Sequence, residues 1–195
     1  MKGRAALRAA AIVLVLTLGF SGAAFAAVLA GTGGPDAIEG TIGADTISGL
    51  GGGDVLAGDP SLFGAGGDDA ISGGAGEDQV FGRGGDDLVR GGPGADEVSG
   101  TLGSDAVYGG GGGDIVDDGP FTDASADDIS GGSGDDIMDA YNDPAFTDVV
   151  GCGPGYDVAY TDGTDVVSGD CEETIVGAHP DAWDERPYQP APFRD

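Results

Sequence analysis

The residues best suited to chemistry in this sequence are aspartates that recur every nine residues. Asp78, Asp87 and Asp96 each stand at the sixth position of a block of the form G-G-x-G-x-D-x-U-x, in which U is a large apolar residue. Carboxylate oxygens suit calcium, and the glycines permit positive φ angles and close packing, so that backbone carbonyls can converge on an ion. Each aspartate is explained by this turn pattern, so the pairs of carboxylates do not indicate a catalytic acid and base. The spacing therefore predicts a row of calcium sites.

A second periodic feature is the apolar residue two places after each aspartate. It alternates with polar neighbours, as a short, half-buried β-strand requires. The composition alone, with 42 Gly and 35 Asp or Glu in 195 residues, would favour a disordered chain. A flexible linker does not explain the apolar positions, so we expect an ordered repeat with a narrow internal ladder. That ladder consists of Ile38, Ile47, Leu56, Ile71, Val80, Val89, Val98, Val107, Val116 and Ile129.

The nonapeptide resembles the hemolysin-type, or RTX, calcium-binding repeat over roughly residues 31–160. In that family the first six residues of a repeat form a turn that binds calcium, and the last three form a short strand. The resemblance implies an all-β fold, namely a right-handed parallel β-roll (a β-solenoid) with two nonapeptide repeats per coil and about seven coils. It also implies that Ca²⁺ is the cofactor.

Two repeats per coil place alternate aspartates on the same side of the roll, in two ladders. The first ladder is Asp36, Asp54, Asp78, Asp96, Asp114, Asp136 and Asp157. The second ladder is Asp45, Asp69, Asp87, Asp105, Asp127, Asp148 and Asp165. Three expanded half-turns, within residues 58–72, 118–130 and 140–151, all fall in the second ladder. We expect these loops to break the second ladder and leave the first continuous.

Glycine at the fourth position of the repeat decides which aspartates are expected to bind calcium. It persists along the whole first ladder, which has six gaps between successive aspartates, and along three gaps of the second. Up to about nine ions are therefore expected. The predicted calcium ligands are Asp36, Asp54, Asp78, Asp96, Asp114, Asp136, Asp157, Asp45, Asp69, Asp87 and Asp105. Little or no calcium is expected near Asp127 and Asp148, whose turns lack the glycines.

The stacking of like charges suggests why an ion is needed. Successive coils place carboxylates about 5 Å apart, where two unit charges repel by about 1 kcal/mol in water and about 3 kcal/mol at an effective dielectric constant of 20. We therefore expect the chain to be largely disordered without calcium and to fold as calcium binds.

Residues 1–26 have the pattern of a secretory signal peptide. Lys2, Arg4 and Arg8 precede an apolar run, and Ala24-Phe25-Ala26 forms a small-x-small cleavage site. The run of about 12 apolar residues is too short to span a bilayer, so we expect a secreted protein without a transmembrane anchor after cleavage. Residues 27–195 contain 35 acidic residues and 4 Arg, a formal charge of −31 that excludes nucleic acid as a partner.

The only two cysteines lie near the end of the repeats. Cys171 follows Cys152 by 19 residues, close to the 18 of one coil, so the two are expected on adjacent coils, where they can form a disulfide. This arrangement resembles the Cys-containing C-terminal cap of secreted bacterial RTX-like proteins; two free thiols are the alternative. The expected domains are the signal peptide, a β-roll with its cap over residues 27–176, and a Pro-rich irregular tail over residues 177–195.

Three functional classes remain. The leading interpretation is a non-enzymatic, extracellular calcium-binding protein. An enzyme is disfavoured because residues 27–195 have no Lys and the single His179 lies outside the repeats. The third class is an adhesion or polysaccharide-binding module that contacts an extracellular glycan or cell-surface component. It would use the loop-bearing face, on which each loop carries a Pro and a Phe: Pro60 and Phe63, Pro120 and Phe121, and Pro144 and Phe146. Packing of these Phe rings back onto the roll is the alternative.

Overall fold

The computed structural model describes residues 25–60, 65–120, 123–142 and 145–177. Within these residues the chain forms sixteen short strands and no helix. The strands are β1 (Val28–Ala30), β2 (Ala37–Glu39), β3 (Thr46–Gly51), β4 (Val55–Ala57), β5 (Ala70–Ala75), β6 (Gln79–Gly84), β7 (Leu88–Pro93), β8 (Glu97–Leu102), β9 (Ala106–Gly111), β10 (Ile115–Asp117), β11 (Asp128–Ser133), β12 (Ile137–Ala140), β13 (Val149–Gly151), β14 (Val158–Thr161), β15 (Val166–Val167) and β16 (Glu173–Val176).

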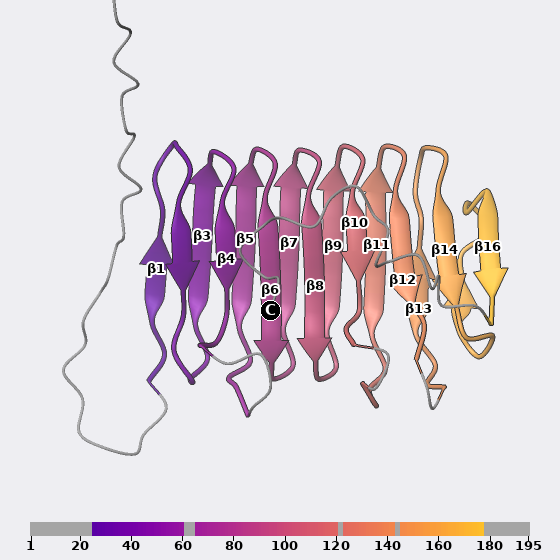
Figure 1. Cartoon of the computed structure of the whole chain (residues 1–195), viewed down its shortest axis with the longest axis horizontal. Helices are drawn as coiled ribbons and strands as arrows, with labels where there is room; N and C mark the ends of the chain where they lie inside the picture. The colour runs from indigo at the N-terminus through magenta and orange to yellow at the C-terminus, as the bar shows by residue number, and fades with distance from the viewer. Residues whose placement is uncertain (1–24, 61–64, 121–122, 143–144, 178–195) are drawn as a thin grey trace, which may run out of the picture.

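The strands build a solenoid of two parallel sheets (Figure 1). Odd-numbered strands form one eight-stranded sheet, and even-numbered strands form the other. Every pairing is parallel and joins a strand to the one two places along the chain, as in β7 with β9. The predicted parallel β-roll is confirmed. It has about eight turns rather than seven, because β1 precedes the first ladder aspartate and β16 follows the last.

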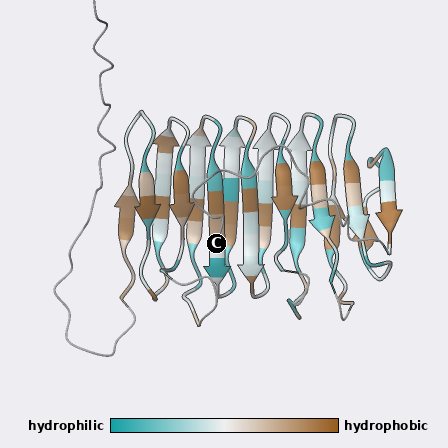
Figure 2. Cartoon of the chain, in the orientation of Figure 1, coloured by the Kyte–Doolittle hydropathy of each residue, from teal (hydrophilic) through white to brown (hydrophobic). Residues whose placement is uncertain are grey.

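The core consists of two rows of apolar side chains, one from each sheet; Figure 2 shows hydrophobic residues recurring along the strands. All ten positions of the predicted internal ladder are buried; Leu56, Val80, Val98 and Val116, for example, are 0% exposed. Register stacks like upon like, with Val80 opposite Val98 on neighbouring coils. The rows continue beyond the predicted range through Leu29, Met138, Val150 and Ala159.

Glycines are required in the turns for two different reasons. At the second and fourth positions φ is positive, for example 123° at Gly110 and 141° at Gly112. At the first position the constraint is space. A Cβ on Gly91 would lie 2.5 Å from Asp96 Oδ2 and 2.7 Å from the Gly109 carbonyl oxygen. The sequence alone does not show which of the three glycine positions needs a positive φ angle and which needs space.

The two edges of the roll differ as the sequence predicts. We call the edge that runs from the odd strands to the even strands the first edge; it carries the first aspartate ladder. Its turns are short and uniform and lie at the top of Figure 1, whereas the second edge, at the bottom, carries the expanded half-turns. The loop residues Phe63, Phe121 and Pro144 lie outside the described residues, and Phe146 is half-buried.

The last coils are closed by the disulfide between Cys152 and Cys171, with a Cα–Cα distance of 5.2 Å. The predicted pairing on adjacent coils is confirmed, and Cys152 packs into the end of the core. The expected signal peptide, apart from its last two residues, and the tail from residue 178 lie outside the described residues. Within the described part, no helix is long and apolar enough to cross a membrane.

Candidate metal centre

The aspartates of the first ladder are buried and linked by hydrogen bonds from coil to coil. Each backbone N–H donates to the Oδ1 atom of the equivalent aspartate one coil further on. The N–H of Asp78 lies 2.8 Å from Asp96 Oδ1, and that of Asp96 lies 2.9 Å from Asp114 Oδ1. The series ends at Glu172, whose Oε2 accepts from the Asp157 N–H at 2.9 Å. One carboxylate oxygen of each of these aspartates thus already accepts a hydrogen bond from the backbone.

In most aspartates of both ladders, the second carboxylate oxygen is buried without a hydrogen-bond partner. This holds for the Oδ2 atoms of Asp54, Asp69, Asp78, Asp87, Asp96, Asp105, Asp114, Asp127, Asp136, Asp148 and Asp157. A buried carboxylate oxygen without a partner costs free energy unless a donor or a cation approaches it. The same unsatisfied atom therefore recurs at each half-turn from Asp54 to Asp157, whereas the Oδ2 atoms of Asp36 and Asp45 accept hydrogen bonds from the N–H groups of Thr32 and Thr41.

Backbone carbonyls lie beside these oxygens. A Cβ built on Gly49 would lie 2.2 Å from Asp54 Oδ2 and 2.4 Å from the Gly73 carbonyl oxygen of the next coil. The two oxygens therefore fall within about 5 Å of each other, the width of one calcium ion between opposite ligands. A hard cation would fit between successive coils. The unpartnered carboxylate oxygen and the carbonyl oxygen would bind it, and glycine leaves the space free because it has no side chain. Asp54 would hold it on the first ladder.

The second ladder is continuous, so the expectation that the loops break it is wrong. The N–H of Asp105 donates to Asp127 Oδ1 at 2.6 Å, and that of Asp127 donates to Asp148 Oδ1 at 2.8 Å. The hydrogen bond needs only a backbone N–H and a carboxylate one coil further on. The inserted residues are therefore accommodated outside the ladder.

On the second edge, an aspartate oxygen and a carbonyl oxygen lie together beside the first-position glycine, as on the first edge. The Gly82 position still combines Asp87 Oδ2 with the Gly100 carbonyl oxygen, at 2.3 and 2.6 Å from a built Cβ. At Gly100 the three nearest atoms all belong to Asp105. That calcium binding stops near Asp105 on this edge stays a prediction, because the Asp118 carbonyl oxygen of the next coil still accepts a hydrogen bond from the Thr101 N–H at 2.9 Å.

Burial raises the pKa of most ladder carboxyls, and neighbouring carboxylates raise it further, against the lowering effect of their backbone hydrogen bonds. The pKa rises to about 7 for Asp69, Asp87, Asp114 and Asp127, to about 6 for Asp96 and Asp148, and to about 8 for Asp105. A protein without a bound cation would therefore hold protons at these positions under mildly acidic conditions and still hold part of them at neutral pH, and a divalent cation would displace them.

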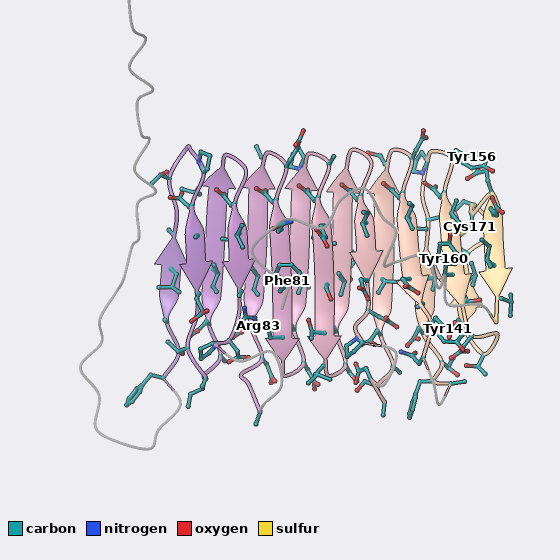
Figure 3. The ribbon with its side chains drawn as sticks, in the orientation of Figure 1. Phe81, Arg83, Tyr141, Tyr156, Tyr160 and Cys171 are labelled. Carbon is teal, nitrogen blue, oxygen red and sulfur yellow. A yellow bond between two sulfur atoms is a disulfide. The ribbon has the colours of Figure 1, made fainter. Side chains whose placement is uncertain are left out.

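Basic side chains offer these aspartates little compensation. Arg83 and Arg90 are the only basic residues in the described part of the chain. Arg83, labelled on the loop-bearing edge in Figure 3, donates to the Asp59 carbonyl oxygen at 2.6 Å and lies 3.8 Å from Glu39. Arg90 lies over the ring of Tyr108. Neither forms an ion pair with a ladder carboxylate.

Sequence reasoning missed a further group of buried polar residues on the second edge. Asp59, Asp118, Asp123, Asp139 and Asn142 are each at most 5% exposed. They belong to or border the expanded half-turns, outside the sixth position of a repeat. Only the packing of the loops against the coils reveals them.

The comparisons with known proteins agree with this geometry. A family model for the RTX calcium-binding nonapeptide repeat matches the chain four times, at residues 24–60, 61–89, 81–116 and 121–143. A search of curated proteins finds no match to the chain.

Proposed function

Because the chain belongs to the family of proteins with RTX calcium-binding nonapeptide repeats, we propose that it is a secreted, non-enzymatic calcium-binding protein that folds on its ligand. The ligands on each coil would be the ladder carboxylates and the neighbouring glycine carbonyls. Calcium would neutralise the ladders and connect successive coils.

One observation carries this proposal: the repeated, buried Oδ2 atom without a partner. A fold that buries so many carboxylates needs positive charge, and the described part supplies only two Arg. All-oxygen ligands in flexible turns suit calcium better than softer metals. Affinities in the range of about 10⁻⁴ to 10⁻³ M, typical of extracellular modules, would suit the calcium level outside cells.

A non-enzymatic role is supported by the way the carboxylates are used. In ladder aspartates such as Asp78 and Asp96, Oδ1 accepts a backbone hydrogen bond, and Oδ2 lies beside a carbonyl oxygen of the next coil. Neither is arranged as an acid and base around a substrate. Secretion is supported by the disulfide, which is typical of oxidising compartments, and by the N-terminal pattern. Sequencing the N-terminus of the protein recovered from the medium tests this part; we expect Ala27.

Calcium titration of the purified chain tests calcium binding and coupled folding together. Far-UV circular dichroism should change from a disordered to a β-rich spectrum over the same calcium range in which calorimetry detects binding. Magnesium at equal concentration is the control, because it demands a smaller octahedral site. A β-rich spectrum that does not change when calcium is removed would contradict coupled folding, and absence of heat would contradict calcium binding.

A further inference from the structure

The upper part of the second ladder gathers three carboxylates that do not follow the repeat. One oxygen each of Asp118, Asp127 and Asp148 lies within 4.8 Å of the other two. All three residues are buried, with exposures of 1%, 4% and 0%. The sequence predicts little or no calcium in this region, because the turns lack glycine.

Asp118 reaches this cluster because it occupies a glycine position. The register pairs Asp117 with Ser99, so Asp118 follows at the coil position of Gly100. A Cβ on Gly100 would lie 2.3 Å from Oδ2 of Asp105, the ladder aspartate of the same half-turn. At the equivalent place one coil later, the side chain of Asp118 therefore points toward Asp127. There the aspartate adds a carboxylate where the repeat has a glycine.

Asn142 provides a second, independent observation. Its Nδ2 donates to Asp118 Oδ2 at 3.2 Å, which orients that carboxylate. Its own Oδ1 is buried without a hydrogen-bond partner, in a side chain that is 2% exposed. Asp118 Oδ1, Asp127 Oδ2 and Asp148 Oδ2 likewise lack partners. The three carboxylates thus each offer an unsatisfied acceptor, and the side chain bonded to Asp118 carries a fourth.

No charge of the opposite sign balances this cluster in the described part of the chain. The two Arg side chains there make their contacts elsewhere, with Asp59 and Glu39 and with Tyr108. Burial raises the pKa of Asp118 well above its ordinary value, and the charges of Asp117, Asp148, Asp127 and Asp139 raise it further. Ionised, the three carboxylates would repel one another strongly in a buried site.

We propose that Asp118, Asp127 and Asp148, with the amide oxygen of Asn142, form a calcium site that is separate from the glycine turns. The spread of 4.8 Å fits an ion bound at about 2.3–2.6 Å from each oxygen. The cluster contains no His or Cys, so zinc is disfavoured. The inference rests on the proposed function for the identity of the ion but not for the existence of the site.

The position of this site suggests its role. Asp118 follows β10, Asp127 precedes β11 and Asp148 precedes β13. An ion there would connect two coils and hold the bases of two expanded half-turns. Metal binding would thus extend past the point at which the glycine pattern ends.

Variants of Asp118 in the full chain test the proposal, with native mass spectrometry to count bound calcium and circular dichroism to verify folding. Asp118→Asn keeps the shape of the side chain, and Asp118→Gly restores the residue found at the equivalent position 100. Asp128→Asn is the matched control, because it removes the same charge from an exposed residue beside Asp127. We expect one ion fewer in both Asp118 variants and an unchanged number in Asp128→Asn.

Thermal unfolding in saturating calcium gives a second readout. If an ion is bound, Asp118→Asn should lower the midpoint relative to Asp128→Asn, because a ligand is lost. If no ion is bound, removing a buried, unbalanced carboxylate should raise the midpoint, and this would overturn the proposal. An unchanged ion count in a folded Asp118 variant would also overturn it. A wild-type chain that binds no calcium at all would instead overturn the proposed function.

Discussion

The raised pKa values of the ladder carboxyls predict that acid can replace calcium in folding the chain. Seven ladder aspartates have a pKa of about 6 to 8 in the folded chain: Asp69, Asp87, Asp96, Asp105, Asp114, Asp127 and Asp148. In the unfolded chain their pKa returns to about 4. Without calcium, the folded chain therefore holds about six more protons than the unfolded chain near pH 5.

The sign follows from this difference. Where the folded state binds more protons, the free energy of unfolding falls as pH rises, by about 1.4 kcal/mol per pH unit for each proton. Seven independent groups would give about 10 kcal/mol per unit. If solvent screening and coupling reduce this to one third, the loss is still about 3 kcal/mol per unit and about 6 kcal/mol from pH 4.5 to 6.5. A small domain has about 5–15 kcal/mol in total.

We therefore expect the calcium-free chain to be β-rich near pH 4 and disordered at pH 7.5. Far-UV circular dichroism of the metal-free chain between pH 3.5 and 8 measures this, with sedimentation to detect aggregation close to the pI of about 4.1. The double variant Asp87→Asn and Asp105→Asn should shift the transition to higher pH, because two of the most affected carboxyls are gone. In calcium the trend should reverse, since protons compete with the ion for the carboxylates. A metal-free chain that is equally ordered at pH 4 and 7.5, or disordered at both, would refute the reasoning.

Three substitutions test the packing of the roll in calcium. Gly112→Ala should cost at least about 2 kcal/mol, because φ is 141° and the new Cβ would meet the Gly94 carbonyl oxygen at 1.6 Å; Gly111→Ala, next to it, should be tolerated. Val98→Ala should cost about 2 kcal/mol through a core cavity, whereas Val149→Ala, at a side chain 49% exposed, should cost little. Replacing both cysteines by Ser should cost about 3 kcal/mol, since the disulfide closes a loop with a sequence separation of 19. Urea unfolding in saturating calcium measures all three, and comparable losses in a variant and its control would contradict the corresponding prediction.

The repeat made most of the fold predictable. A fixed period places every sixth-position aspartate and every eighth-position apolar residue in the same environment, so one correct assignment extends to Val80, Val98 and Val116 alike. The disulfide followed from the same arithmetic. The continuity of the second ladder did not, because its hydrogen bonds depend on a backbone N–H and are indifferent to the glycines that define the sequence motif.

Residues outside the period were not predictable from it. Glu172 closes the first ladder with a longer side chain and a different residue type, so no aspartate marks the position. Asp118 looks like an ordinary loop residue until the register assigns it to a glycine position. Asn142 enters the same cluster from another loop. Their roles depend on how expanded half-turns fold back, and a pattern of spacings carries no information about that.

The glycine contacts also distinguish the two edges. On the first edge, a Cβ at the fourth position of nearly every turn would meet the carbonyl oxygen of the preceding coil, at 1.4 Å for Gly76 and 1.6 Å for Gly155. The second edge loses this stacking beyond Gly103, and there the expanded half-turns bring in Asp118, Asp123 and Asn142. On our proposal, the upper part of the second edge binds calcium through the side-chain oxygens of Asp118, Asp127, Asp148 and Asn142, so replacing Asp118 should remove an ion from the second edge and leave the first edge with all its ions.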